Sequence, residues 1–229
     1  MKKTVLITGA TDGIGKALAL QLAGKYNLAL CGRSEEKMQK LVPELGECLL
    51  YTQCFDITDA ASRHTFCENV KNAFGTVDVL VNNAGANTKK DKITDIDLSD
   101  LRYMFELNCV SAVGMIQEVY PLMAAQQKGL FVNILSSCCL FNNPMTGSYS
   151  ASKDAMEGIS KILTKETKKD HIGVCSVYPG GVNTNFRPTE NPNYLKPETV
   201  ARMIKTCIEN EDGCVHDIVI RPFIEDNMA

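Results

Sequence analysis

Short runs of consecutive apolar residues, many of them β-branched, alternate along this chain with longer stretches in which apolar residues recur every three or four positions. The short runs predict buried β-strands near Thr4–Thr8, Leu28–Cys31, Cys48–Phe55, Val77–Val81, Leu130–Leu135, Gly173–Val177 and His216–Ile220. The longer stretches predict α-helices near Lys16–Lys25, Glu35–Leu45, Ala60–Phe74, Ser99–Ala125, Ser148–Lys168 and Pro197–Glu209.

This order of strands and helices predicts a parallel sheet, because a helix between two strands returns the chain to the edge where the first strand began. The strands are apolar at nearly every position, which is typical of a sheet covered on both faces. The sequence therefore predicts an α/β doubly wound fold of the Rossmann type with three layers, α/β/α. No repeat or linker interrupts the 229 residues, so we expect a single domain over residues 1–229.

Charge and composition narrow the classes of partner. The net charge of −3 gives no electrostatic basis for binding nucleic acid or an anionic membrane. No apolar run approaches the roughly 18 to 20 residues that a membrane-spanning helix needs. The apolar run that follows Lys2 and Lys3 is short and leads directly into a glycine-rich turn, unlike a signal peptide. We therefore expect a cytoplasmic protein with no membrane partner.

The chain has ten cysteines but no Cys-x-x-Cys pair. Most lie inside apolar segments, and without an export signal the sequence favours reduced, buried thiols over disulfides. Cys138 and Cys139 are notable because they adjoin a candidate catalytic residue. The three histidines, His64, His171 and His216, have no ligand spacing, so no metal site is predicted.

A glycine-rich turn follows the first predicted strand and leads into the first predicted helix. It runs Thr8-Gly9-Ala10-Thr11-Asp12-Gly13-Ile14-Gly15. Gly9 would permit a tight turn, Gly13 the close approach of a pyrophosphate, and Gly15 close packing of the helix on the strand. The helix N-terminus would offer free N–H groups to phosphates. The alternative is a βα turn that binds nothing, but the order strand, turn, helix favours a dinucleotide-binding loop.

Tyr149-Ser-Ala-Ser-Lys153 places a phenol and an ammonium four residues apart, on one face of a predicted helix. A free tyrosine has a pKa near ~10 and is a poor acid or base at neutral pH, but a neighbouring positive charge lowers that value. The pair is a candidate acid/base centre. Alone, such spacing is more typical of two ordinary surface residues, so its interpretation depends on the other motifs.

Taken together, these motifs resemble the classical short-chain dehydrogenases/reductases, in the right order and over essentially the whole chain. The further matches are Asp56 closing the third strand, Asn82-Asn83-Ala84-Gly85 after the fourth, Asn108, Ser136, and Pro179-Gly180-Gly181-Val182-Asn183-Thr184. Ser136 precedes Tyr149 by thirteen residues, the family spacing, and the competing Ser137 is one residue short. Leu135 and the pair Cys138-Cys139 depart from the family pattern beside the serine.

The resemblance implies a catalytic tetrad of Asn108, Ser136, Tyr149 and Lys153. Tyr149 would exchange a proton with the substrate oxygen, and Lys153 would lower its pKa and bind the nicotinamide ribose. Ser136 would donate a hydrogen bond to the carbonyl oxygen, and Asn108 would hold a water that connects Lys153 to solvent. The implied enzyme transfers a hydride between a nicotinamide and a ketone or secondary alcohol, as a carbonyl reductase does.

Two alternatives keep the fold but change the function. One is an NAD(P)-binding regulatory protein without significant turnover, but such proteins tend to lose the Tyr149 or Lys153 equivalent. The other is an epimerase or dehydratase of the extended relatives, against which the glycine spacing and the short C-terminal region argue.

The end of the second strand favours NADP(H) over NAD(H). It runs Leu30-Cys31-Gly32-Arg33-Ser34, without the acid that would bind both ribose hydroxyls. Arg33 could pair with a 2′-phosphate and Ser34 could add a hydroxyl. Alternatively, Arg33 is a solvated turn residue, and Asp12 stands where some NADP-dependent relatives have a basic residue. The cofactor-binding residues that the resemblance implies are Gly9, Thr11, Asp12, Gly13, Ile14, Gly15, Arg33, Ser34, Asp56, Ile57, Asn83, Ala84, Gly85, Tyr149, Lys153, Pro179, Gly180, Val182 and Thr184.

The substrate is a small carbonyl or alcohol whose identity the sequence leaves open. A Pro- and Asn-rich segment, about residues 185–197, is expected to be a loop that covers it. Within or near this loop, Arg187 either meets a substrate carboxylate or is solvated. Four apolar or aromatic side chains could line an apolar substrate pocket or could equally belong to ordinary packing: Phe141, Met145, Phe186 and Tyr194. Relatives pair the two long helices across a two-fold axis, which implies a homodimer or homotetramer.

Overall fold

The computed structural model describes residues 2–186 and 191–225. Within them lies one seven-stranded sheet in the order β3-β2-β1-β4-β5-β6-β7, and every neighbouring pair is parallel. The strands are β1 (Thr4–Ile7), β2 (Asn27–Gly32), β3 (Leu50–Cys54), β4 (Val79–Asn82), β5 (Gly129–Ile134), β6 (Ile172–Pro179) and β7 (Asp217–Ile220). The predicted doubly wound α/β fold is confirmed.

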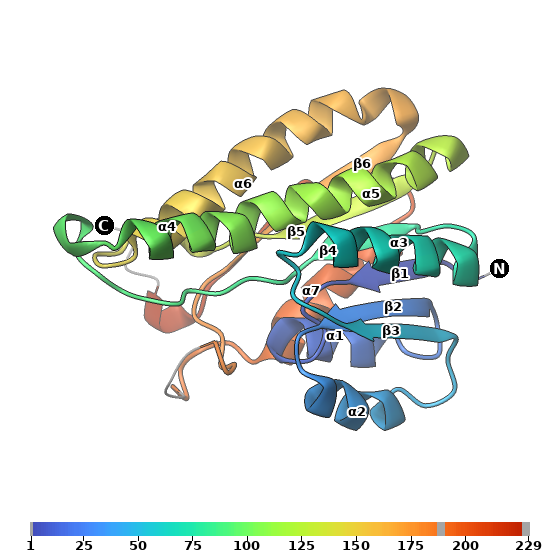
Figure 1. Cartoon of the computed structure of the whole chain (residues 1–229), viewed down its shortest axis with the longest axis horizontal. Helices are drawn as coiled ribbons and strands as arrows, with labels where there is room; N and C mark the ends of the chain where they lie inside the picture. Colours follow the sequence, from blue (N-terminus) through green and yellow to red (C-terminus); the bar gives the residue numbers. More distant parts are fainter. Residues whose placement is uncertain (1, 187–190, 226–229) are drawn as a thin grey trace.

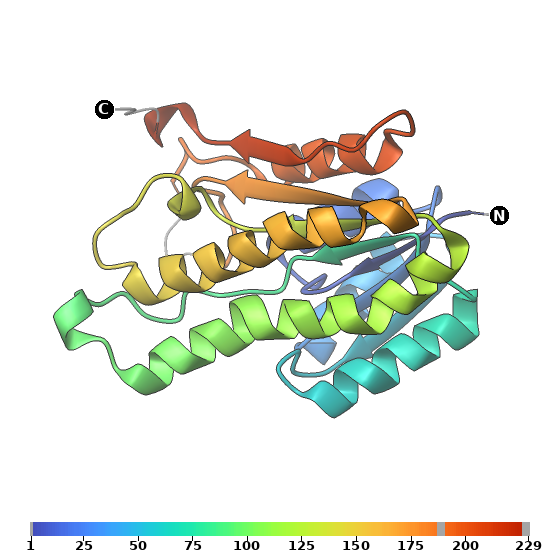
Figure 2. The same ribbon diagram turned by 90° about the horizontal axis from the view of Figure 1, so that it is seen from above.

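Helices cover both faces of this sheet (Figure 1). On one face lie α1 (Gly13–Leu22), α2 (Glu35–Glu44) and α7 (Pro197–Glu209). On the other lie α3 (Ala60–Phe74), α4 (Leu98–Phe105), α5 (Ser111–Gln126) and α6 (Gly147–Glu166). Viewed from above, α4 continues into α5 as one long rod beside α6 (Figure 2).

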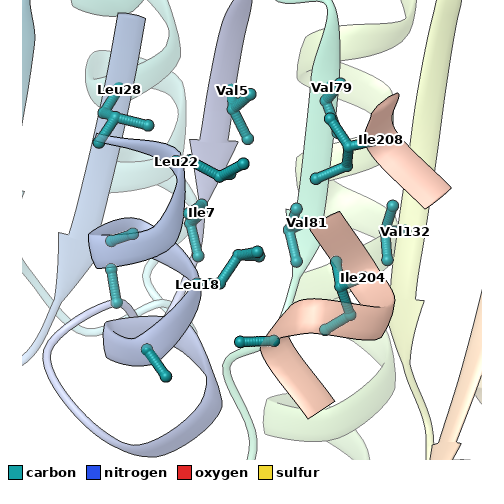
Figure 3. Close-up of a cluster of buried hydrophobic side chains, with 14 of the residues drawn as sticks. Val5, Ile7, Leu18, Leu22, Leu28, Val79, Val81, Val132, Ile204 and Ile208 are labelled. Atoms are coloured by element: carbon teal, nitrogen blue, oxygen red, sulfur yellow. The ribbon is translucent and has the colours of Figure 1, made fainter. Parts of the chain in front are cut away.

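Each face of the sheet has its own hydrophobic core, because successive side chains of a strand point to opposite faces. Val5 and Ile7 of β1 are fully buried against Leu18 of α1 and Ile204 of α7 (Figure 3). The intervening Leu6 is fully buried in the second core, toward α3 and α5. The strands are apolar at nearly every position because both of their faces are covered.

The predicted helix 99–125 differs from the structure in its middle. Residues Glu106–Val110 form a π-helical turn between α4 and α5. Such turns are rare and frequently lie at functional sites, and Asn108 lies inside this one. The hydrophobic period of the two flanking helices continues through the turn, so the sequence pattern does not reveal it.

Two smaller predictions of element bounds are also wrong. The first helix begins at Gly13 instead of Lys16, so the last two glycines of the glycine-rich turn belong to its first turn. β3 ends at Cys54, so Asp56 lies in the loop beyond the strand and does not close it. No helix in the described part of the chain has both the length and the apolar character to cross a membrane.

The direction of winding reverses between β1 and β4: β2 and β3 follow on one side, β5 to β7 on the other. In open α/β sheets, ligands bind outside the carboxyl ends of the strands at this reversal. The glycine-rich turn follows β1, Asn83 to Gly85 follow β4, and Ser136 comes shortly after β5. The fold therefore places the predicted site residues at one edge.

Candidate active site

A cavity of about 930 Å³ opens at this edge of the sheet. Most of the predicted residues line it: Gly9, Thr11, Asp12, Gly13, Ile14, Arg33, Ser34, Ile57, Asn83, Ala84, Gly85, Ser136, Tyr149, Lys153, Pro179, Gly180, Val182 and Thr184. Gly15, Asp56 and Asn108 are absent from its described wall. The structure thus brings together residues from six loops and the start of α6.

Two glycines of the turn after β1 adopt backbone conformations that favour glycine. The φ angles are +63° at Gly9 and +51° at Gly13. A Cβ at Gly9 would lie 2.9 Å from Ala84 Cα, and one at Gly13 would lie 2.9 Å from Thr184 Cγ2. A Cβ at Gly15 would lie 2.5 Å from Asn83 Nδ2, which explains why this residue supports the loop without facing the cavity.

Thr8 and Asn83 fix the spacing between the loops that follow β1 and β4. Thr8 Oγ1 accepts hydrogen bonds from the backbone N–H groups of Asn83 and Ala84, each at 3.0 Å. Asn83 Nδ2 donates to the carbonyl oxygens of Thr8 and Gly9 at 2.9 and 3.0 Å. This role of Thr8 was not predicted from the sequence. Its only signal there was a hydroxyl at the end of a buried apolar strand.

Asp12 is the N-cap of α1 and joins three segments. Its carboxylate accepts from Gly13 N at 2.7 Å and from Asn185 Nδ2 at 2.8 Å, and it forms an ion pair with Lys37 of α2. Burial raises the pKa of Asp12, but the hydrogen bonds from Lys37, Asn185 and Gly13 outweigh it and the pKa falls below its ordinary value. Lys37 also lines the cavity, although it was not predicted from the sequence as a site residue.

Arg33 and Ser34 follow β2 at the same end of the cavity. Arg33 is exposed, whereas the Ser34 hydroxyl caps α2 by accepting from Lys37 N at 3.2 Å. A Cβ at Gly32 would lie 2.7 Å from Thr11 Cγ2, so the position has little room for the acid of NAD-binding relatives. Arg33 and Lys37 give this end two positive charges.

The carboxylate of Asp56 accepts hydrogen bonds from within its own loop. Oδ1 accepts from Thr58 N at 2.9 Å and from Thr58 Oγ1 at 2.8 Å. The backbone N–H of Thr58 is the main reason that the pKa of Asp56 lies below its ordinary value. The neighbouring Ile57 lines the cavity, and Asp56 shapes the loop that presents it.

Tyr149 and Lys153 both lie on α6, and both line the cavity. The Lys153 side chain is buried, and Nζ donates to the carbonyl oxygen of Ile134 at 2.8 Å. Burial lowers the pKa of Lys153 to about 8 because it penalises the charged form. The ring of Tyr149 lies edge-on to that of Phe186, with 5.7 Å between the centroids.

Ser136 begins a 3₁₀ turn, Ser137–Cys139, just after β5. Its Oγ accepts from Cys138 N at 3.2 Å. Ser137 and Cys138 also line the cavity, and a hydrogen bond to Cys139 lowers the pKa of the Cys138 thiol. In the part of the chain that the structure describes, all ten cysteines are free thiols.

Asn108 is buried and ties the loop after β4 to α6. Its Oδ1 accepts from Ala86 N and its Nδ2 donates to Ala86 O, both at 2.9 Å. Nδ2 also donates to Ser152 Oγ at 3.0 Å, and that hydroxyl donates to Tyr149 O at 2.7 Å. The Asn108 side chain thus fixes the position of α6, and therefore of Tyr149, relative to the loop after β4.

The loop after β6 closes the other end of the cavity. Gly180 N donates to Ile220 O at 2.8 Å, and Gly181 N donates to Glu225 Oε1 at 3.0 Å. Phe186, Tyr194 and Glu225 line the cavity, whereas Phe141 and Met145 are absent from its described wall. Phe141 instead packs against the Arg221 guanidinium, 4.1 Å from its ring centroid. Arg187 lies outside the described residues.

The fold around this cavity is a Rossmann fold, and comparison with known proteins identifies the family. The family model of short chain dehydrogenases matches residues 3–195, and the chain belongs to that family. It is similar to the NADPH-dependent pterin aldehyde reductase of Arabidopsis thaliana, with 33% identity over 80% of this chain and 76% of the relative. It is also similar to the NADP-dependent 3-hydroxy acid dehydrogenase of Schizosaccharomyces pombe, with 29% identity over 93% and 89%.

A solved structure of similar fold is the alcohol dehydrogenase of the archaeon Thermococcus sibiricus in complex with 5-hydroxy-NADP. Its TM-score is 0.90, with 25% identity and coverage of 97% of both chains.

Proposed function

We propose that this protein is an NADP(H)-dependent oxidoreductase that transfers a hydride between the nicotinamide and a ketone or secondary alcohol, with Tyr149 as the general acid/base. The observation that carries the proposal is that Tyr149, Lys153 and Ser136 line the same cavity as the glycine-rich turn. An acid/base pair and a dinucleotide-binding loop are thereby within reach of one ligand.

The residues present fit a dinucleotide. Gly9 and Gly13 keep the backbone free of side chains beside the N-terminus of α1, where phosphates bind favourably. Arg33 and Lys37 place positive charge at the end of β2, where Gly32 supplies no acid. Both relatives have NADP or NADPH in their names, and the archaeal alcohol dehydrogenase is in complex with 5-hydroxy-NADP. These similarities support NADP(H) as the cofactor.

A bound nicotinamide would supply or accept the hydride. The chain would handle the proton and the developing charge. In the reducing direction, Tyr149 donates its phenolic proton to the substrate oxygen, and Ser136 donates a hydrogen bond to the same oxygen. Charged Lys153 favours the phenolate that remains. Asn108 holds α6 against the loop after β4 through Ala86 and Ser152, which keeps Tyr149 at a fixed position.

The loop of about residues 185–197 is proposed to cover the substrate, since Phe186 packs on Tyr149 and Tyr194 lines the cavity. We further propose a single domain, a cytoplasmic location, and a homodimer or homotetramer built through α4, α5 and α6. Two exposed apolar side chains are consistent with such an interface: Val110 in the π-helical turn between α4 and α5, and Ile162 on α6.

The alternative is a cofactor-binding regulatory protein without turnover. Retention of Tyr149 and Lys153 in the cavity wall favours the enzyme. The test is to mix purified protein with NADPH and a panel of aldehydes and ketones and to follow NADPH absorbance, with NADH run in parallel. We expect oxidation of NADPH by at least one carbonyl and slower oxidation of NADH. NADPH binding without turnover on any panel member would favour the regulatory protein.

A further inference from the structure

The loop proposed to hold the nicotinamide, residues 179–184, is braced by the C-terminal turn of the described chain. This turn, Phe223–Glu225, follows β7 and lies beyond its carboxyl end, at the end of the sheet where β6 also ends. In Figure 2 it lies at the same end of the molecule as the loop that follows β5. Glu225 brings a carboxylate from this turn into the cavity wall.

Glu225 contacts the backbone of the loop at its two consecutive glycines. Oε1 accepts a hydrogen bond from Gly181 N at 3.0 Å. A Cβ at Gly180 would lie 2.3 Å from Oε2, and a Cβ at Gly181 would lie 2.8 Å from Oε1. The carboxylate therefore fills space that any side chain at these positions would take, and it satisfies an N–H group of the loop.

Arg221 lies close to the same carboxylate and attracts it by its opposite charge. Its Nε lies 3.8 Å from Glu225 Oε2, and its guanidinium stacks on the Phe141 ring. Arg221 Nε and Nη1 are buried and have no hydrogen-bond partner among the described residues. Phe141 belongs to the segment that follows Ser136, so this cluster joins three segments: the one after Ser136, the loop 179–184 and the segment 221–225.

We propose that Glu225 is a positioning residue for the nicotinamide half of the cofactor, with Arg221 as its support. This inference rests on the proposed function. Glu225 orders the loop through its hydrogen bond with Gly181 N, and the ordered loop presents Pro179, Gly180, Val182 and Thr184 to the ligand. Because the loop is already ordered, ligand binding loses less conformational entropy of the loop. The adenosine end of the cavity is formed by Arg33, Lys37 and the glycine-rich turn, which lie on other elements, and Glu225 itself contacts Gly180, Gly181 and Arg221 instead.

The test compares two ligands by isothermal titration: NADP⁺, and 2′-phospho-ADP-ribose, which lacks the nicotinamide. Glu225→Ala should weaken NADP⁺ by about tenfold, which is the loss expected for one charge-assisted hydrogen bond. It should leave 2′-phospho-ADP-ribose within about twofold of the parent. Glu225→Gln, which keeps an acceptor for Gly181 N, should recover most of the NADP⁺ affinity. Glu209→Ala serves as the control, because Glu209 is exposed on α7 and pairs only with Lys25 among the contacts of the described chain.

Binding of 2′-phospho-ADP-ribose also shows that each variant is folded. Equal affinity of parent and Glu225→Ala for NADP⁺ would overturn the inference and leave the proposed function standing. Equal weakening of both ligands would also overturn it, because Glu225 would then stabilise the fold in general. A parent that binds neither ligand would overturn both the inference and the proposed function.

Discussion

Replacing Arg33 with alanine should weaken NADPH and leave NADH nearly unchanged. A hydrogen bond to a charged partner contributes about 1.5 to 3 kcal/mol. Arg33 is exposed at the end of β2, so solvent screening brings its contribution below this range, to about 1 to 1.5 kcal/mol. This corresponds to about five- to tenfold weaker binding of NADPH.

Lys37 should contribute less than Arg33. Its ammonium is already paired with Asp12, so a 2′-phosphate would compete with a carboxylate for the same charge. We expect Lys37→Ala to weaken NADPH by about two- to fivefold, again without loss of NADH. Gly32→Asp is a poorer probe of selectivity, because its Cβ would press on Thr11 and disturb both cofactors alike.

The assay is fluorescence titration of NADPH and NADH for the parent and both variants. Lys40→Ala is the matched control, since Lys40 lies on the same helix and pairs with Glu36 on the exposed surface. Raising the salt concentration should shrink the difference between parent and Arg33→Ala for NADPH. Equal weakening of both cofactors by Arg33→Ala would rule out a contact between Arg33 and the 2′-phosphate, and so would a parent that already prefers NADH.

Three further outcomes are expected. Burial lowers the pKa of Lys153 from 10.5 to about 8, so between these values the unfolded chain binds a proton that the folded chain lacks, and stability rises with pH. Urea titrations of the parent and of Lys153→Met should measure this effect as the difference between their free energies of unfolding. This difference should rise by up to about 3 kcal/mol between pH 8 and pH 10.5. A difference that does not change with pH would show that the pKa of Lys153 is not lowered. Gly85→Ala should lower the steady-state turnover rate at least tenfold. The reason is that the new Cβ would lie 2.8 Å from Asn108 Oδ1 and 3.3 Å from Lys153 Nζ. A rate near that of the parent would show that the site tolerates the methyl group. Light scattering at micromolar concentration should show a dimer or tetramer, and a monomer alone would contradict the proposed assembly.

The sheet and its layers were predictable from the sequence because each rests on a local pattern. Apolar runs such as Val5-Leu6-Ile7 bury both faces of a strand, and this requirement shows directly in consecutive residues. The glycine-rich turn was predictable for a similar reason, since Gly9 and Gly13 need backbone conformations that few other residues adopt. Helix α3 was placed correctly at both ends, where Asp59 and Gly75 cap it.

The remainder depends on contacts between distant segments, which no local pattern records. Lys37 meets Asp12 from another helix, and Glu225 meets Gly181 across 44 residues of chain. The hydroxyl of Thr8 acts on backbone groups 75 residues away. In the π-helical turn around Asn108, apolar residues recur with the same spacing as in the flanking helices, so the sequence pattern does not distinguish it from them.

Tyr149→Phe is the decisive test of whether Tyr149 is the proton donor of a nicotinamide-dependent reduction. The change removes the hydroxyl and keeps the ring that packs against Phe186. The measurement is the rate of NADPH oxidation with the best carbonyl of the panel, beside the dissociation constant of NADPH for the same variant. We expect turnover to fall by at least about 10²-fold while NADPH binding stays within a few-fold of the parent. Turnover within a few-fold of the parent would contradict this role of Tyr149.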